Sequence, residues 1–121
     1  MLVDSSGWIE YLAERPKADA FARYIEGREA LLASAIQVFE IYRVIRRDLS
    51  EEKAIESVAA LQRSRIVEVD TSLALEAAEL TFEYRLAMAD ALIYATARRH
   101  DAKLVTCDAD FDGLPGALVV R

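Results

Sequence analysis

Short apolar segments alternate with longer amphipathic ones along the whole chain. Five segments are rich in aliphatic residues and have the length of strands, and they cover residues 2–3, 30–33, 66–69, 103–106 and 117–120. The longer segments between them repeat apolar residues every three or four positions, which is typical of helices that bury one face. They cover approximately residues 5–12, 16–26, 35–48, 51–62, 71–84 and 88–100.

The order of these elements predicts the fold class. One or two helices follow each of the first three strands. A short acidic loop over residues 108–116 follows the fourth strand. Strands that alternate with helices form a parallel sheet, and the helices cover both of its faces. A chain of 121 residues without a linker, repeat or low-complexity stretch predicts one α/β domain over residues 1–121.

Polar residues mark where several helices begin. Ser5 and Ser6 are expected to cap the first helix, and Ser34 is expected to cap the long helix that runs to about Asp48. Asp70 stands at the corresponding position before the helix that ends near residue 84. These residues predict helix boundaries and carry no chemistry by themselves.

Composition excludes several classes of protein. Hydrophobic residues make up 54% of the chain, which is too many for a disordered protein, and no apolar run has membrane length. The first residues do not resemble a signal peptide, and the single Cys107 forms no internal disulfide, so we expect a cytoplasmic protein. A net charge of −6 argues against a basic coat for nucleic acid, although it permits a nuclease.

Four acidic residues, far apart in the sequence, are expected at one edge of the sheet. Asp4 ends the first strand, Asp108 lies two residues past the fourth strand, and Glu40 lies early in the helix after the second strand. Asp90 begins the apolar helix that runs into the fourth strand. Ligands of open parallel sheets bind beyond the carboxyl ends of the strands. Two carboxylates about 4 Å apart repel by roughly 4 kcal/mol at an effective dielectric near 20, so the cluster indicates a divalent cation.

Each of these acids also has a purely structural interpretation. Asp4 and Asp90 suit the beginning of a helix, where an acid is stabilised by the helix dipole. Glu40 shares a helix face with Arg43 and Arg47 and is in a position to form an ion pair with either of them. Arginines 43, 46 and 47 fit two roles equally well: they bind phosphate beside Glu40, or they form a solvated or partner-facing surface.

Three segments together resemble the PIN-domain ribonucleases of the VapC toxin type. They are LVDSSGWIEYL at the start, ASAIQVFEIYRV in the middle and LAMADALIYATARRHDAKLVTCDADFDGLPG near the end. The resemblance implies a three-layer α/β/α fold whose five parallel strands have the order 3-2-1-4-5. It also implies an endoribonuclease that depends on Mg²⁺ or Mn²⁺, hydrolyses RNA by metal-activated water, forms a homodimer and binds a cognate antitoxin.

The resemblance assigns roles to individual residues. Asp4, Glu40, Asp90 and Asp108 match the four acids of the family, and Asp4 and Asp90 are expected to be the most direct metal ligands. The supporting residues are Thr106, which matches a hydroxyl before the last acid, and Ser5. Asp110 or Asp112 would supplement Asp108, and Arg43 would contact phosphate.

Two other classes of protein are compatible with parts of this pattern. A receiver-like signalling domain also has parallel strands and an acidic magnesium pocket, with Asp70 as its phosphate acceptor. That fold calls for adjacent acids after the first strand and a lysine after the last, and neither is present here. A noncatalytic RNA-binding module with the same fold is the second alternative, and four retained acids argue against it.

Overall fold

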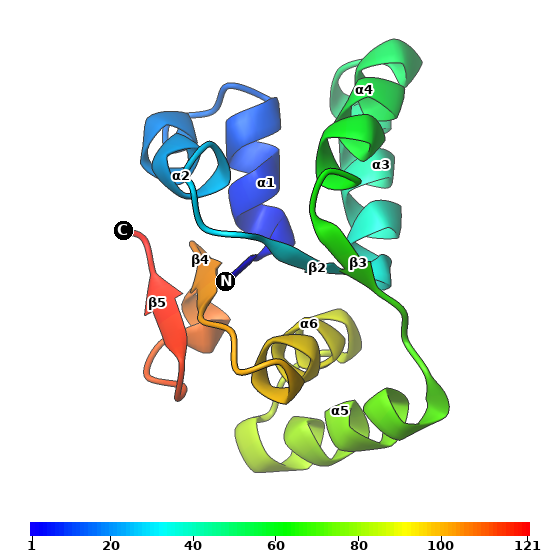
Figure 1. Cartoon of the computed structure of the whole chain (residues 1–121), viewed down its shortest axis with the longest axis vertical. Coiled ribbons are helices and arrows are strands. Elements are labelled where there is room, and N and C mark those ends of the chain that lie inside the picture. The colour runs from blue at the N-terminus through cyan, green and yellow to red at the C-terminus, as the bar shows by residue number, and fades with distance from the viewer.

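The computed structural model describes all of residues 1–121, and the elements follow the predicted order (Figure 1). The strands are β1 (Leu2–Val3), β2 (Leu32–Ser34), β3 (Arg65–Val67), β4 (Leu104–Thr106) and β5 (Ala117–Val119). The helices are α1 (Ser5–Leu12), α2 (Ala18–Ile25), α3 (Ala35–Asp48), α4 (Glu51–Leu61), α5 (Thr71–Tyr84) and α6 (Met88–Arg99). A short 3₁₀ helix, η1 (Ala109–Phe111), lies between β4 and β5.

The five strands form one parallel sheet in the order β3-β2-β1-β4-β5. This confirms the predicted α/β class and the predicted strand order. The neighbours β1 and β4 are distant in sequence, and Val3 lies opposite Val105 in their ladder. The sheet therefore places the residues that follow β1 next to the residues that follow β4.

Side chains that alternate along the central strands divide the core into two layers. Leu2 and Leu104 point into a cluster with residues of α5, α6 and η1, whereas Val3 and Val105 point into a cluster with residues of α1 to α4. In Figure 1, α5 and α6 lie below the sheet and α1 to α4 lie above it. Both faces are covered, which explains why Leu2, Val3, Leu104 and Val105 are apolar on both sides of the sheet. No helix offers the sustained apolar length that crossing a bilayer requires.

The ends of two strands differ from the prediction by one or two residues. The predicted segment 30–33 is paired from Leu32 to Ser34, and Ala30 O accepts a hydrogen bond from the N-terminal ammonium group at 3.2 Å. The predicted segment 66–69 pairs from Arg65 to Val67 against β2, and the chain then leaves the sheet. The partner strand decides which residues pair, and the apolar pattern of one segment does not contain that information.

The start of α1 also differs from the prediction. Asp4 occupies the N-cap position, and the Ser5 and Ser6 hydroxyls bond to Glu40 and Asp4 instead of capping the helix. The expected cap of α3 is present: Ser34 Oγ accepts from the Ile36 N–H at 3.4 Å, and Gln37 completes a capping box. Hydroxyls of one residue type thus have different partners, because only the tertiary structure brings acids near the start of α1.

Candidate active site

Asp4 is the most buried of the acids, and two hydroxyls hold it in place. It follows β1 directly, its side chain is 3% exposed, and its backbone N–H donates to Val105 O at 2.8 Å. Asp4 Oδ2 accepts hydrogen bonds from Ser6 Oγ and from Thr106 Oγ1, both at 2.8 Å. Burial raises the pKa of Asp4, and these two hydrogen bonds act in the opposite direction. The carboxylate is therefore fixed in orientation and poorly solvated.

Thr106 links Asp4 to the loop that carries Asp108. Thr106 is fully buried at the end of β4, and its Oγ1 accepts from the Asp108 N–H at 2.9 Å while donating to Asp4. Asp108 in turn accepts the Asp110 N–H at Oδ1, at 2.9 Å. One hydroxyl thus sets the direction in which the acidic loop leaves the sheet, so the predicted supporting role of Thr106 has a concrete geometric basis.

Glu40 approaches the same edge of the sheet from α3. It is half-buried and accepts a hydrogen bond from Ser5 Oγ at 2.7 Å. Burial raises the pKa of Glu40, the bond from Ser5 lowers it, and the nearby charge of Asp4 raises it further. The alternative ion pair with Arg43 or Arg47 does not form, and Arg47 pairs with Asp48 instead. Glu40 is therefore a neighbour of the other acids and not a partner of the arginines on its own helix.

Asp90 lies in the first turn of α6, where the charges of the other four acids affect its pKa. Burial, followed in order by the charges of Asp4, Asp108, Glu40 and Asp110, raises the pKa of Asp90 to about 7. No lysine or arginine forms an ion pair with Asp90. Five carboxylates thus interact within one region without a compensating basic side chain.

Three of these carboxylates have the spacing of ligands around one ion. One oxygen each from Asp90, Asp108 and Asp110 lies within 4.8 Å of the others. Mg²⁺ and Mn²⁺ prefer carboxylate oxygens, and Mg²⁺ binds them at about 2.0–2.1 Å. The donor set therefore fits a hard divalent cation. It includes Asp110, whereas Asp4 lies beside this group with one oxygen already bonded to two hydroxyls.

The remaining residues of the acidic loop and of α3 lie at the margin of this site. Asp112 forms an ion pair with Arg121 at 2.9 Å and is not a member of the three-carboxylate group. Arg43 is exposed one turn after Glu40, on a groove along the outer face of α3. Of the two supplementary acids expected from the sequence, the structure brings Asp110 and not Asp112 to Asp90.

Two polar residues support the site in roles that were not predicted from the sequence. Ser6 donates to Asp4 and also accepts the Cys107 N–H at 3.2 Å, so it connects β1 to the loop after β4. Gln37, fully buried, accepts the Ser34 N–H at 2.9 Å and donates to Val3 O at 2.8 Å. The Ser34-x-x-Gln37 spacing is a capping-box signal that was available in the sequence. No sequence pattern indicates the bridging role of Ser6.

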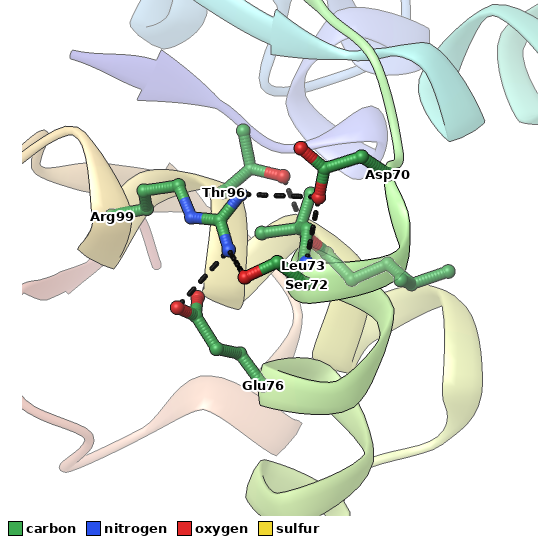
Figure 2. A network of polar contacts seen from close by, with 7 residues as sticks. Asp70, Ser72, Leu73, Glu76, Thr96 and Arg99 are labelled. Atoms are coloured by element: carbon green, nitrogen blue, oxygen red, sulfur yellow. Dashed lines mark hydrogen bonds and ion pairs between the residues drawn. The ribbon is translucent and has the colours of Figure 1, made fainter.

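Asp70, the acceptor expected for a receiver-like domain, has a structural role. Figure 2 shows its carboxylate accepting the Leu73 N–H and facing Arg99, at 2.8 and 3.3 Å. Arg99 also contacts Ser72 and Glu76, so the network joins the start of α5 to the end of α6. Asp90 lies at the other end of α6. At a rise of 1.5 Å per residue, it is about 13 Å from Arg99 along the helix axis. Asp70 therefore caps a helix outside the acidic site.

Comparisons with known proteins agree with this geometry. No curated protein matches the sequence. A solved toxin–antitoxin complex from Klebsiella pneumoniae is similar over 98% of this chain and 95% of that one, with 26% identity and a TM-score of 0.82. Mycobacterium tuberculosis VapC20, a toxin that cleaves the sarcin-ricin loop, is similar over 99% and 98%, with 21% identity and a TM-score of 0.81. VapBC2 from Rickettsia felis, bound to a promoter DNA fragment, is similar over 98% and 96%, with 16% identity and a TM-score of 0.74.

A family model provides the most direct comparison, because it covers almost the whole chain. The model of the PIN domain matches residues 1–117, which include every strand residue except those at the end of β5 and all five clustered acids. With its strand order and its acidic edge, the chain belongs to the PIN-domain family.

Proposed function

We propose that the protein is a VapC-type toxin, an endoribonuclease that uses Mg²⁺ or Mn²⁺ to hydrolyse RNA phosphodiester bonds. The observation that carries this proposal is the uncompensated group of carboxylates around Asp90, at the carboxyl edge of a PIN-domain sheet. Cleavage of RNA by VapC20, which shares the fold, supports the choice of reaction and of substrate class.

The residues of the site have separable roles in this proposal. Asp90, Asp108 and Asp110 would hold the cation, and Asp4 and Glu40 would bind it directly or through its water ligands. When bound, such an ion lowers the pKa of a water molecule and offsets charge on the phosphoryl group. Thr106 and Ser6 fix the Asp4 carboxylate, and Ser5 fixes Glu40, so these oxygens are positioned before substrate arrives.

Substitution of Asp90 tests the proposal. Asp90→Asn removes a charge and a ligand without a change of size, so we expect RNA cleavage in Mg²⁺ or Mn²⁺ to fall at least a hundredfold while the fold is retained. Asp112→Asn is the matched control, because Asp112 pairs with Arg121 outside the site and should leave cleavage unchanged. Cleavage by Asp90→Asn at the wild-type rate would refute the assignment.

The products distinguish the mechanism. Attack by water on the phosphorus leaves a 5′-phosphate and a 3′-hydroxyl, and end-specific ligation of the RNA fragments before sequencing detects both. Fragments that end in a 2′,3′-cyclic phosphate would contradict hydrolysis by water. RNA binding without any cleavage in either metal would instead favour a noncatalytic RNA-binding module.

We also infer a cognate antitoxin and a homodimer. Two of the similar structures are described as toxin–antitoxin or VapBC complexes, which supports the first of these partners. Light scattering on purified protein should give twice the 13.5 kDa mass of the chain. A concentration-independent monomer would contradict the homodimer.

A further inference from the structure

A groove on the outer face of α3, the helix that carries Glu40, differs from the acidic site in charge. It has a volume of about 690 Å³ and is lined by Phe39, Tyr42, Arg43, Arg46, Arg47 and Glu51 among others. Three arginines and one glutamate line it, in a chain whose net charge is −6. The groove is thus a locally basic surface on an acidic protein.

The groove also exposes an aromatic ring. Phe39 is 62% exposed, which is unusual for phenylalanine, and it lies one helical turn before Arg43 on the same face of α3. Nucleobases stack on exposed aromatic side chains, and guanidinium groups bind phosphate with two parallel hydrogen bonds. Phenylalanine and arginine at this spacing therefore match the two repeating parts of a single-stranded nucleic acid.

The arginines of the groove are available to a ligand. Arg43 forms no ion pair with an acid. Arg46 pairs with Glu51 at 3.6 Å and Arg47 with Asp48 at 2.7 Å, and the side chains of both arginines are more than half exposed. Exposed ion pairs of this kind contribute little stability, so exchanging a carboxylate for a phosphate costs little.

Helix α3 carries both the groove and one of the clustered acids. Glu40, bonded to Ser5 at the edge of the sheet, is the direct neighbour of Phe39 and lies one turn before Arg43. We propose that the single-stranded RNA substrate runs along α3, with one base stacked on Phe39 and its phosphates bound by Arg43 and Arg46. This inference rests on the proposed function, and it assigns these side chains to positioning the substrate beside the acids.

Binding of two synthetic probes tests this proposal. The probes are a fluorescent twelve-nucleotide oligo(A) and an abasic RNA of equal length, measured with the full chain in an Asp90→Asn background that does not cut them. Phe39→Ser should weaken oligo(A) binding about tenfold and leave abasic binding unchanged, because only the stacked base is lost. Arg43→Gln and Arg46→Gln should weaken both probes, and each should reduce the slope of log K against log salt by about 0.7.

Matched controls come from exposed residues away from the groove. Phe82→Ser removes an 83% exposed ring from α5, and Arg28→Gln removes an unpaired charge between α2 and β2. Groove variants that bind like these controls would overturn the proposal. So would an equal loss for both probes with Phe39→Ser, since that reports a structural effect and not stacking.

Other occupants of the groove give different results. If Phe39→Ser dissociates a dimer while RNA affinity stays the same, the groove belongs to a second copy of the chain, and the proposal fails. It also fails if a twelve-residue poly(glutamate) peptide, and not oligo(A), loses affinity in the groove variants.

The groove proposal and the proposed hydrolase activity can fail separately. If the groove variants weaken probe binding but the wild-type chain cleaves no RNA, the hydrolase activity is refuted and RNA binding in the groove is supported. Normal cleavage with unchanged KM in Phe39→Ser would refute the groove alone.

Discussion

At the scale of single residues, the site is defined by how each carboxylate is compensated. Asp4 has two hydroxyl donors, Glu40 has one, and Asp90 forms no ion pair with any basic residue. Accordingly, burial and neighbouring acids raise the pKa of Asp90 to about 7. The folded, metal-free protein therefore holds a proton on Asp90 at pH values where the unfolded chain, with an Asp pKa of about 3.9, has released it.

This difference predicts how stability depends on pH without metal. Because the folded state binds more protons between about pH 4 and 7, the contribution of Asp90 to the free energy of unfolding decreases as pH rises through that window. We expect Asp90→Asn to be more stable than wild type at pH 8 and to approach wild type near pH 4. Urea denaturation in the presence of EDTA measures both values. A difference that does not vary with pH would contradict the assignment.

Asp70 provides a control of opposite sign. The Leu73 N–H and then Arg99 lower the pKa of Asp70, so its contribution to stability is present at pH 7 and is lost as pH falls below about 4. Asp70→Asn should therefore destabilise the protein at pH 7, and this cost should fade in acid.

Thr106 is the residue on which the orientation of the acidic loop depends. Thr106→Val keeps the shape of the side chain and removes the donor to Asp4 and the acceptor for the Asp108 N–H. We expect the free energy of unfolding to fall by about 1–3 kcal/mol, since the buried Asp4 carboxylate and the partly buried Asp108 N–H each lose a partner. Thr106→Ser retains the hydroxyl and should lose much less. Equal stabilities for the Val and Ser variants in urea denaturation would contradict this role.

At the scale of elements, the contact between α1 and α2 requires a residue without a side chain. A Cβ atom at Gly7 would lie 2.4 Å from Phe21 Cε1 and 2.9 Å from Val3 Cγ1. Phe21 is fully buried in the layer formed by α1 to α4, so the ring has little room to move. Gly7 thus allows α1 to lie close to α2 at the point where Asp4 leaves β1.

Gly7→Ala tests this packing. We expect the free energy of unfolding to fall by about 1–3 kcal/mol from overpacking, and this outweighs the gain of up to about 1 kcal/mol that alanine brings to a helix. Phe21→Leu in the same chain should recover part of the loss, because it removes the ring atoms that clash. Chemical denaturation of the two single variants and the double variant measures the coupling. A stabilised Gly7→Ala variant would show that the helices separate freely.

At the scale of the whole molecule, the sheet brings negative charges together that the chain keeps apart. The register of β1 and β4 places Asp4 next to Thr106 and the acidic loop, and α3 and α6 bring Glu40 and Asp90 to the same edge. The two apolar layers hold this arrangement against the repulsion. A bound cation would remove the repulsion, so metal binding and folding should be coupled.

Metal ions should therefore stabilise the fold. At a hundred times its Kd, Mg²⁺ or Mn²⁺ should add about 2.7 kcal/mol to the free energy of unfolding, which thermal denaturation detects as a higher Tm. At one fixed metal concentration, the increase should be larger at pH 8 than at pH 6, because the proton on Asp90 competes with the ion and weakens its binding at the lower pH. Asp90→Asn should lose most of the response, and Asp112→Asn should keep it. An equal response from both variants would place the ion elsewhere.

The sequence by itself determined the elements and their order, because apolar periodicity, caps and turn residues are local properties. It also predicted that Asp4, Glu40, Asp90 and Asp108 lie at one edge of the sheet, and the family resemblance predicted the strand order 3-2-1-4-5. Only the tertiary structure decided that Asp110 joins Asp90 while Asp112 pairs with Arg121, because residue spacing in a loop does not fix the direction of each side chain. The tertiary structure also decided that Ser5 and Ser6, which were expected to cap α1, donate to Glu40 and Asp4. Their hydroxyls bond to the acids that the fold brings near them.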